Sequence, residues 1–198
     1  MNITLRNIIR RATLATVALL LSFGIAGAQM DLRISKSKIK SSLKRLDQLE
    51  LLAAQLNTAS GSTQAAADQL CQIAKQCKEL SESISHYINQ VNVLGTLQAS
   101  SEKVLQRTLL LTKLDSLSKE LASHKKSISS VGSSIMSTGA SSGTITGTSS
   151  STSSSASNGA SSKTLNSIGA KMLKIAEKEY LYQAMAVGNM ISALGAMK

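Results

Sequence analysis

The 198-residue chain contains no proline and no tryptophan, and its aromatic residues are one phenylalanine and three tyrosines. Proline ends helices and marks turns, so its absence favours long, uninterrupted helices. β-Sandwiches and barrels depend on aromatic and β-branched residues, and modules that stack on bases depend on aromatic rings. The shortage therefore predicts an all-α protein with no specific nucleic-acid partner.

Residue patterns that carry chemistry are also missing. The sequence shows no Walker loop, no dinucleotide fingerprint, no G-x-S-x-G, and no C-x-x-C or H-x-x-x-H spacing. His86 and His124 are its only histidines, and His124 falls on an apolar seam, where burial is expected. We therefore predict no enzyme activity, no catalytic residue, no cofactor, no metal site and no small-molecule substrate.

The first 28 residues have the layout of a secretory signal peptide. Arg6, Arg10 and Arg11 precede an apolar stretch over 12–25, and Ala26-Gly27-Ala28 offers a cleavage site. An uncleaved membrane anchor is the alternative, although the apolar stretch is short for a span of about 20 residues. Cleavage predicts a mature chain of residues 29–198, exported to the periplasm or surface of a bacterium.

Positive charge dominates and is unevenly placed. The full chain has a net charge of +11, and the leader holds three of its 22 basic residues and no acid, which leaves +8. A run without acids then forms a predicted basic surface: Arg33, Lys36, Lys38, Lys40, Lys44 and Arg45. Such a run attracts an anionic membrane surface or an acidic partner, and the alternative is a solvated helix face that maintains solubility.

Three amphipathic helices are predicted over 29–136, which we assign to one helical bundle or coiled-coil domain. In the first, residues 32, 39, 46 and 53 are apolar at seven-residue intervals, and a turn cluster follows at 57–63. The second carries a heptad packing seam: Leu70, Ile73, Cys77, Leu80, Ile84, Tyr87, Val91 and Leu94.

The third helix is predicted over about 100–130, with its own seam at Leu110, Leu114, Leu117, Leu121, His124, Ile128 and Val131. Val104, Leu105 and Leu109 add apolar surface near its start. Only a few residues around Gly95 separate it from the second helix. A tight antiparallel hairpin is favoured, and one continuous rod is the alternative.

Cys71 and Cys77 are the only cysteines, and an even count in an oxidising compartment suggests a disulfide. In a continuous helix, six residues give about 9 Å of rise and turn the two side chains apart, which is too far for a bridge. Three outcomes therefore stay open: local unwinding with a bridge, reduced thiols with Cys77 packed as a small hydrophobe, or pairing of Cys71 between chains.

Residues 137–162 are almost entirely Ser, Thr, Gly and Ala without charge, which predicts a flexible linker. Residues 163–198 then predict a separate C-terminal helix, amphipathic at first and uncharged over 180–197. That segment carries a stripe of small residues spaced for close helix–helix contact: Ala184, Gly188, Ser192 and Ala196. Three roles stay open for residues 180–197: a packed or oligomerising helix, a membrane-contacting helix, or a frayed tail.

The layout of leader, long helices, small polar linker and terminal helix resembles that of minor pilus or periplasmic components of bacterial type IV secretion (conjugation) systems. The resemblance is one of architecture. We expect an exported cell-envelope protein that acts by helix-mediated assembly, either with a protein partner or as a homo-oligomer. The alternatives are a component of such an apparatus and a membrane-active protein that inserts its C-terminal helix.

Overall fold

The computed structural model describes residues 31–56, 64–140 and 156–197. Over these ranges the chain is helical and contains no strand. An N-terminal helix covers 31–56 and is followed by α2 (Gln64–Thr96), α3 (Ser101–Ala140) and α4 (Ala156–Ala196). At 33 to 41 residues, α2, α3 and α4 are each about 50 to 60 Å long, as expected without proline.

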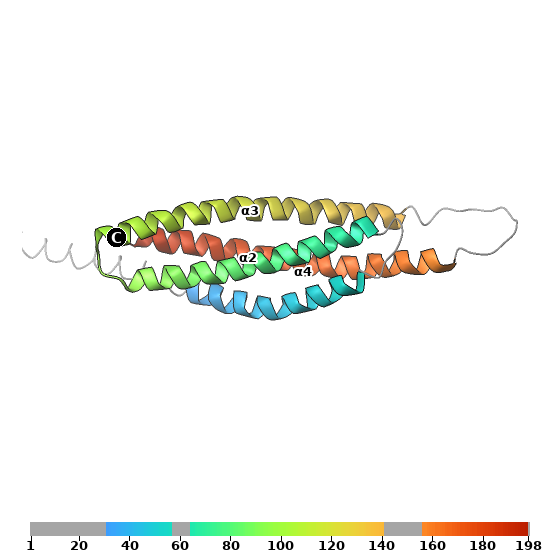
Figure 1. Ribbon diagram of the computed structural model, residues 1–198, viewed down its shortest axis with the longest axis horizontal. Coiled ribbons are helices and arrows are strands. Elements are labelled where there is room, and N and C mark those ends of the chain that lie inside the picture. The colour runs from blue at the N-terminus through green and yellow to red at the C-terminus, as the bar shows by residue number, and fades with distance from the viewer. Residues whose placement is uncertain (1–30, 57–63, 141–155, 198) are drawn as a thin grey trace, which may run out of the picture.

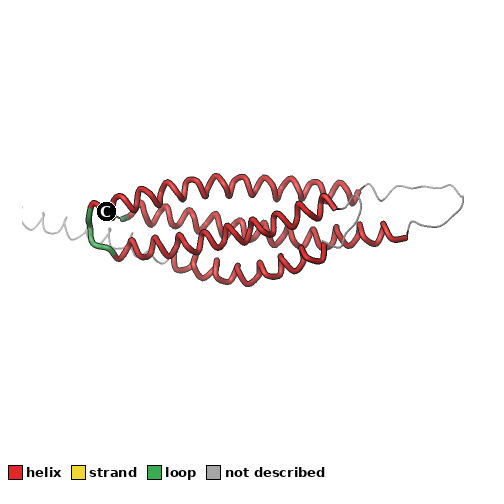
Figure 2. Tube along the Cα trace, viewed as in Figure 1, coloured by secondary structure: helices red, strands yellow, loops and turns green. Residues whose placement is uncertain are grey.

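The helices form an elongated bundle in which α2 and α4 are central (Figure 1). The N-terminal helix lies along one side of this pair and α3 along the other, as the tube trace also shows (Figure 2). Close contacts between residues of different helices show the relative directions of the helices. Gly169 of α4 lies against Leu70 of α2, and Gly95 lies near Met197, so α2 and α4 run parallel. Gly132 lies near Leu173, and Arg107 lies near Gly195, so α3 runs antiparallel to α4.

Each helix buries a seam in which spacings of three and four alternate, the pattern of knobs-into-holes packing. On the N-terminal helix the buried positions are Leu32, Ser35, Ile39, Ser42, Leu46, Leu49, Ala53 and Leu56. On α3 the predicted seam is buried throughout and continues to Ile135. The all-α bundle predicted from the sequence is therefore confirmed.

The predicted seam of α2 is buried at seven of its eight positions. Tyr87 is the exception, because it is only partly buried while the adjacent Ile88 is fully buried. Ala67, Ala74 and Ser81 are buried as well. The wider buried face follows from the central place of α2, which packs against three helices at once.

The connection between α2 and α3 is a tight hairpin, and the continuous rod is excluded. Thr96 Oγ1 donates to the carbonyl of Val93 at 2.7 Å where α2 ends. Ser100 Oγ accepts from the backbone N–H of Lys103 at 3.1 Å, which caps the start of α3. Lys103 Nζ donates to the carbonyl of Leu97 at 2.7 Å and ties the two ends together.

The C-terminal helix is not separate, and this part of the fold prediction was wrong. α4 contributes buried residues along its whole packed length, from Leu165 through Met172 and Met190 to Leu194. The helices also extend further into the Ser/Thr/Gly-rich segment than its composition predicts, because α3 reaches Ala140 and α4 begins at Ala156. The middle of the predicted linker and the predicted leader lie outside the described residues.

Candidate functional site

The core is divided into two apolar clusters by a polar cross-section. One cluster holds the α2 side chains from Leu80 to Leu94, and the other holds those from Ala67 to Cys77. Between them every helix brings polar side chains inside. We call this set the central polar layer: Ser42, Arg45, Gln76, Ser81, His124, Glu179 and Gln183.

Glu179 and Gln183 supply the layer from α4. The Glu179 side chain is fully buried, and its Oε1 accepts from Arg45 Nε at 2.9 Å. Gln183 Nε2 donates to the carbonyl of Cys77 at 2.9 Å and lies 2.8 Å from Ser81 Oγ. These contacts fix α4 in register against both the N-terminal helix and α2.

His124 supplies the layer from α3. It is 3% exposed, as its seam position predicts, and its Nδ1 lies 3.3 Å from Gln76 Oε1. Burial lowers the pKa of His124, because the charged imidazolium loses its hydration. Among the described residues, four atoms of the layer are buried without a hydrogen-bond partner: Ser42 Oγ, His124 Nε2, Glu179 Oε2 and Gln183 Oε1.

The two cysteines do not form a disulfide with each other, and α2 passes through both without unwinding. The bridge within an unwound helix is therefore absent from this structure. Cys71 is half-buried, and its Sγ lies 3.4 Å from the carbonyl oxygen of Ala53. Cys77 packs in the core, where burial and the nearby carboxylate of Glu179 raise the pKa of its thiol to about 12. Cys77 thus packs as the small hydrophobe of the second outcome.

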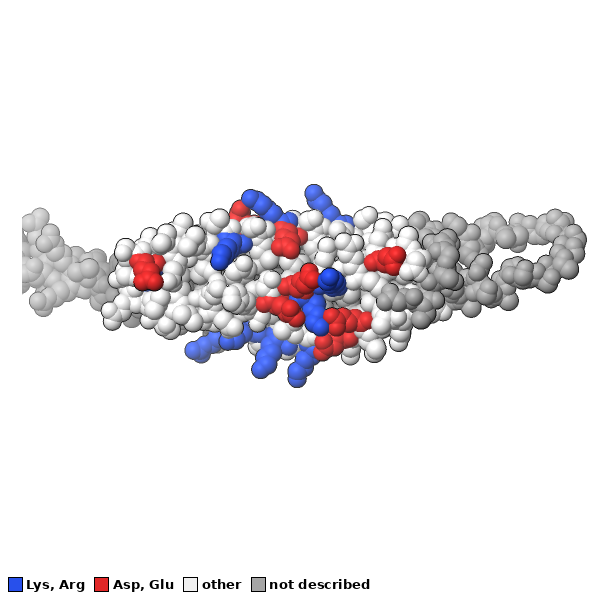
Figure 3. All heavy atoms as spheres, in the orientation of Figure 1, with Lys and Arg blue, Asp and Glu red and all other residues white. Residues whose placement is uncertain are grey.

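The six residues of the predicted basic surface divide into two groups. Lys38 and Arg45 turn toward α4, where both lie over the ring of Tyr182, at 5.7 and 5.5 Å from its centroid. The other four are exposed on the outside of the N-terminal helix: Arg33, Lys36, Lys40 and Lys44. In Figure 3, basic side chains project along the lower edge, which this helix occupies in Figure 1.

The predicted small-residue stripe faces outward. Gly188 and Ser192 are exposed, and Ala184 and Ala196 are half-buried. A Cβ added at Gly188 would meet no atom of another described segment within 4 Å, so no other described helix packs closely against the stripe at Gly188. Large apolar side chains share its side of the helix. We call the whole set the α4 outer face: Leu181, Ala184, Met185, Gly188, Ile191, Ser192, Gly195 and Ala196.

A second exposed apolar region lies where α2 turns into α3. Five large apolar side chains gather within seventeen residues there, and we call them the α2–α3 tip: Val93, Leu97, Val104, Leu105 and Leu109. They are between 42% and 61% exposed. The apolar start of α3 was visible in the sequence, although its exposure was not.

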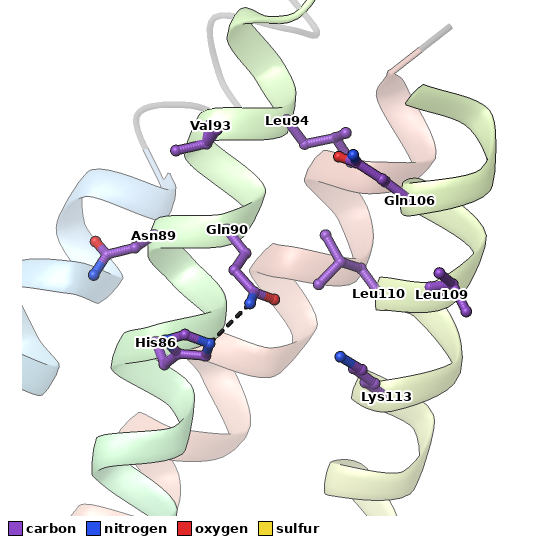
Figure 4. Close-up of a pocket in the computed structure, with 9 residues that line it drawn as sticks. All are labelled: His86, Asn89, Gln90, Val93, Leu94, Gln106, Leu109, Leu110 and Lys113. Carbon is purple, nitrogen blue, oxygen red and sulfur yellow. Dashed lines mark hydrogen bonds between the residues drawn. The ribbon is translucent and has the colours of Figure 1, made fainter. Parts of the chain in front are cut away.

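Next to the tip, a pocket of about 390 Å³ opens between α2 and α3. Leu94 and Leu110 form its floor, and His86, Gln90, Gln106 and Lys113 form its polar wall (Figure 4). This pocket was not predicted from the sequence, because its lining residues lie on two different helices. Among the described residues, no cluster of metal-binding side chains occurs, and no helix is long and apolar enough to cross a membrane.

The chain matches no protein-family model, and comparison with curated proteins and with solved structures likewise found no match.

Proposed function

We propose that the protein is an exported component of the bacterial cell envelope that acts by helix-mediated assembly and performs no catalysis. The observation that carries the proposal is the α4 outer face. It is uncharged, and it holds Leu181 at 59% and Met185 at 52% exposure. Arg107 of α3 reaches its edge at the carbonyl of Gly195, whereas Gly188 and Ser192 at its centre are exposed. Contiguous exposed apolar surface of this kind marks interaction sites.

The geometry of the face suits another helix. Gly188 and Ser192 leave the backbone of α4 open to close approach, and Leu181 and Met185 border this opening as apolar contacts. A second copy of the chain or a helix of another protein would bury these side chains. The exposed basic residues Lys36 and Lys40 lie on a different helix, from which they would favour an anionic surface or acidic partner.

Insertion of residues 180–197 into a membrane is less well supported. Ala186, Met190 and Leu194 are buried in the core, on the side of α4 opposite its outer face. Insertion would have to remove these side chains from the bundle. The uncharged composition of this segment is accounted for by one face in the core and one face available to a partner.

Sedimentation of the full chain over a range of concentrations tests the assembly. We expect self-association, or capture of a defined envelope partner, that is lost when Leu181→Glu and Met185→Glu place charges on the α4 outer face. Leu51→Glu is the matched control, because Leu51 is 64% exposed on the N-terminal helix. If the α4 variants and the control behave alike, the α4 outer face is not the assembly surface.

Export is tested separately. When the chain is expressed in a bacterium, we expect the exported protein to begin at Gln29, as determined by N-terminal sequencing. Retention of the chain inside the cell with Met1 in place would refute the export part of the proposal and leave the assembly part standing.

A further inference from the structure

We propose that the pocket between α2 and α3 binds an amphiphile with a single anionic head and a short aliphatic body, represented by a medium-chain carboxylate. This ligand site goes beyond the proposed assembly function and does not depend on it. The pocket lies on α2 and α3, whereas assembly is assigned to the outer face of α4.

The size and lining of the pocket suit a small ligand. Its volume of about 390 Å³ falls at the lower end of the range of about 300–1,000 Å³ that is typical of ligand pockets. Leu94 and Leu110 are buried at its floor, and Leu109 is exposed at its edge. Leu105 of the α2–α3 tip is also exposed and lies four residues before Leu109, on the same face of α3, which would allow an aliphatic chain to extend from the pocket over Leu105.

The charge of the pocket selects an anion. Lys113 is exposed on α3, and its nitrogen points into the space between α2 and α3 (Figure 4). It is the only charged residue among those that line the pocket, and the ion pairs of the described residues do not include it. A single cation above an apolar floor complements one anionic head group, which would lose less hydration here than a group with several charges.

The remaining polar groups are placed to complete such a site. Gln90 Nε2 and His86 Nε2 lie 2.8 Å apart, which holds both side chains on the α2 wall opposite Lys113. Gln106 Nε2 donates to Glu102 Oε1 at 3.1 Å, which fixes the side chain of Gln106 at the tip end of the pocket. The head group would therefore meet the ammonium group of Lys113 together with amide and imidazole groups.

Octanoate titrated into the full chain tests the site, with imidazole NMR signals as the readout. The chain has only two histidines, so the signals of His86 in the pocket and His124 in the core can be told apart. We expect the His86 signals to shift saturably, with a dissociation constant on the order of 1 mM for so small a ligand, and those of His124 to stay in place. Acetate, without an aliphatic body, and octyltrimethylammonium, with the opposite charge, should not produce this shift.

Two substitutions make the result specific to the pocket. Lys113→Gln should weaken octanoate binding by about threefold or more, because one partly exposed ion pair is lost. Gln90→Glu, which preserves the side-chain shape, should weaken it further by placing a competing carboxylate opposite Lys113. Lys119→Gln is the matched control on the same helix, since Lys119 pairs with Asp115 and does not line the pocket.

The proposal is overturned if octanoate leaves the His86 signals unchanged. It is also overturned if octyltrimethylammonium binds as well as octanoate, or if both pocket variants bind like the Lys119→Gln control. Circular dichroism of each variant establishes that it is folded, and because Lys113 is exposed and Gln90 half-buried, we expect both to fold normally.

Discussion

Gly188 separates the requirements of the fold from those of assembly. A Cβ at this position would meet no atom of another described segment within 4 Å. Glycine costs about 0.8–1 kcal/mol relative to alanine inside a helix. Gly188→Ala and Gly188→Leu should therefore each raise the free energy of unfolding of the single chain by about 0.8 kcal/mol, measured by urea denaturation at low protein concentration.

The same two substitutions should affect assembly differently. Leucine at 188 fills the opening between Ala184 and Ser192, so a partner helix can no longer approach closely, and sedimentation should show dissociation. Alanine should have a much smaller effect. If Gly188→Leu is destabilised within the single chain, the position is not open as described. If it associates as the wild type does, the small-residue stripe plays no part in assembly.

Gly169 provides the contrasting case. A Cβ at Gly169 would lie 2.9 Å from Ile135 Cδ1 and 3.2 Å from Leu70 Cδ1, so this glycine does allow α4 to pack closely inside the bundle. Gly169→Leu should lower the free energy of unfolding by about 1–3 kcal/mol through overpacking. An equal effect of leucine at 169 and at 188 would contradict the distinction between an inner and an outer face of α4.

Three further predictions follow from the central polar layer and the thiols. Burial lowers the pKa of His124, so the unfolded chain binds the additional proton first as the pH falls. The free energy of unfolding should therefore decline below about pH 6.5. His124→Leu should reduce that decline, as measured by urea denaturation at about pH 5–8. Arg45→Ala leaves the fully buried carboxylate of Glu179 without its partner and should lower the free energy of unfolding by about 2 kcal/mol, less than for a fully buried pair because Arg45 is 35% exposed. Lys78→Ala, at an exposed pair, should lower it clearly less. Equal losses for the two variants would contradict this prediction. With its pKa near 12, the buried Cys77 thiol should resist iodoacetamide at pH 8 in the native protein while Cys71 reacts faster, and both should react fully in denaturant, as measured by mass spectrometry.

Much of the bundle was predictable because heptad spacing is a local property. The seam of α3 from Leu110 to Val131 is buried as predicted, and the apolar positions of the N-terminal helix at seven-residue intervals are buried too. At Tyr87 the prediction failed, because two neighbouring residues are apolar and spacing alone does not choose between Tyr87 and Ile88. Tyr87 instead lies partly exposed, with its ring centroid 5.9 Å from that of His86.

The arrangement of α4 was less predictable because it depends on residues distant in the sequence. Over 180–197 no charge marks the wet side, so the pattern does not show which face is inside. Glu179 and Gln183 are buried although such residues are usually exposed, and only their partners on other helices explain this. The same holds for the pocket, since Lys113 and His86 come together only through the hairpin.

The antiparallel pairing of the N-terminal helix with α4 determines how the bundle would respond to a pulling force. Asn189 of α4 meets Ser35 at 2.8 Å, so the described chain begins and ends at the same end of the bundle. Tension applied between Asp31 and Met197 would therefore peel these two helices apart from that end. The Asn189–Ser35 contact would break first and the Arg45–Glu179 pair later. The contacts between the two helices would therefore resist the applied force one after another and not together. The bundle would yield at lower force than one anchored at opposite ends, where the contacts are sheared together.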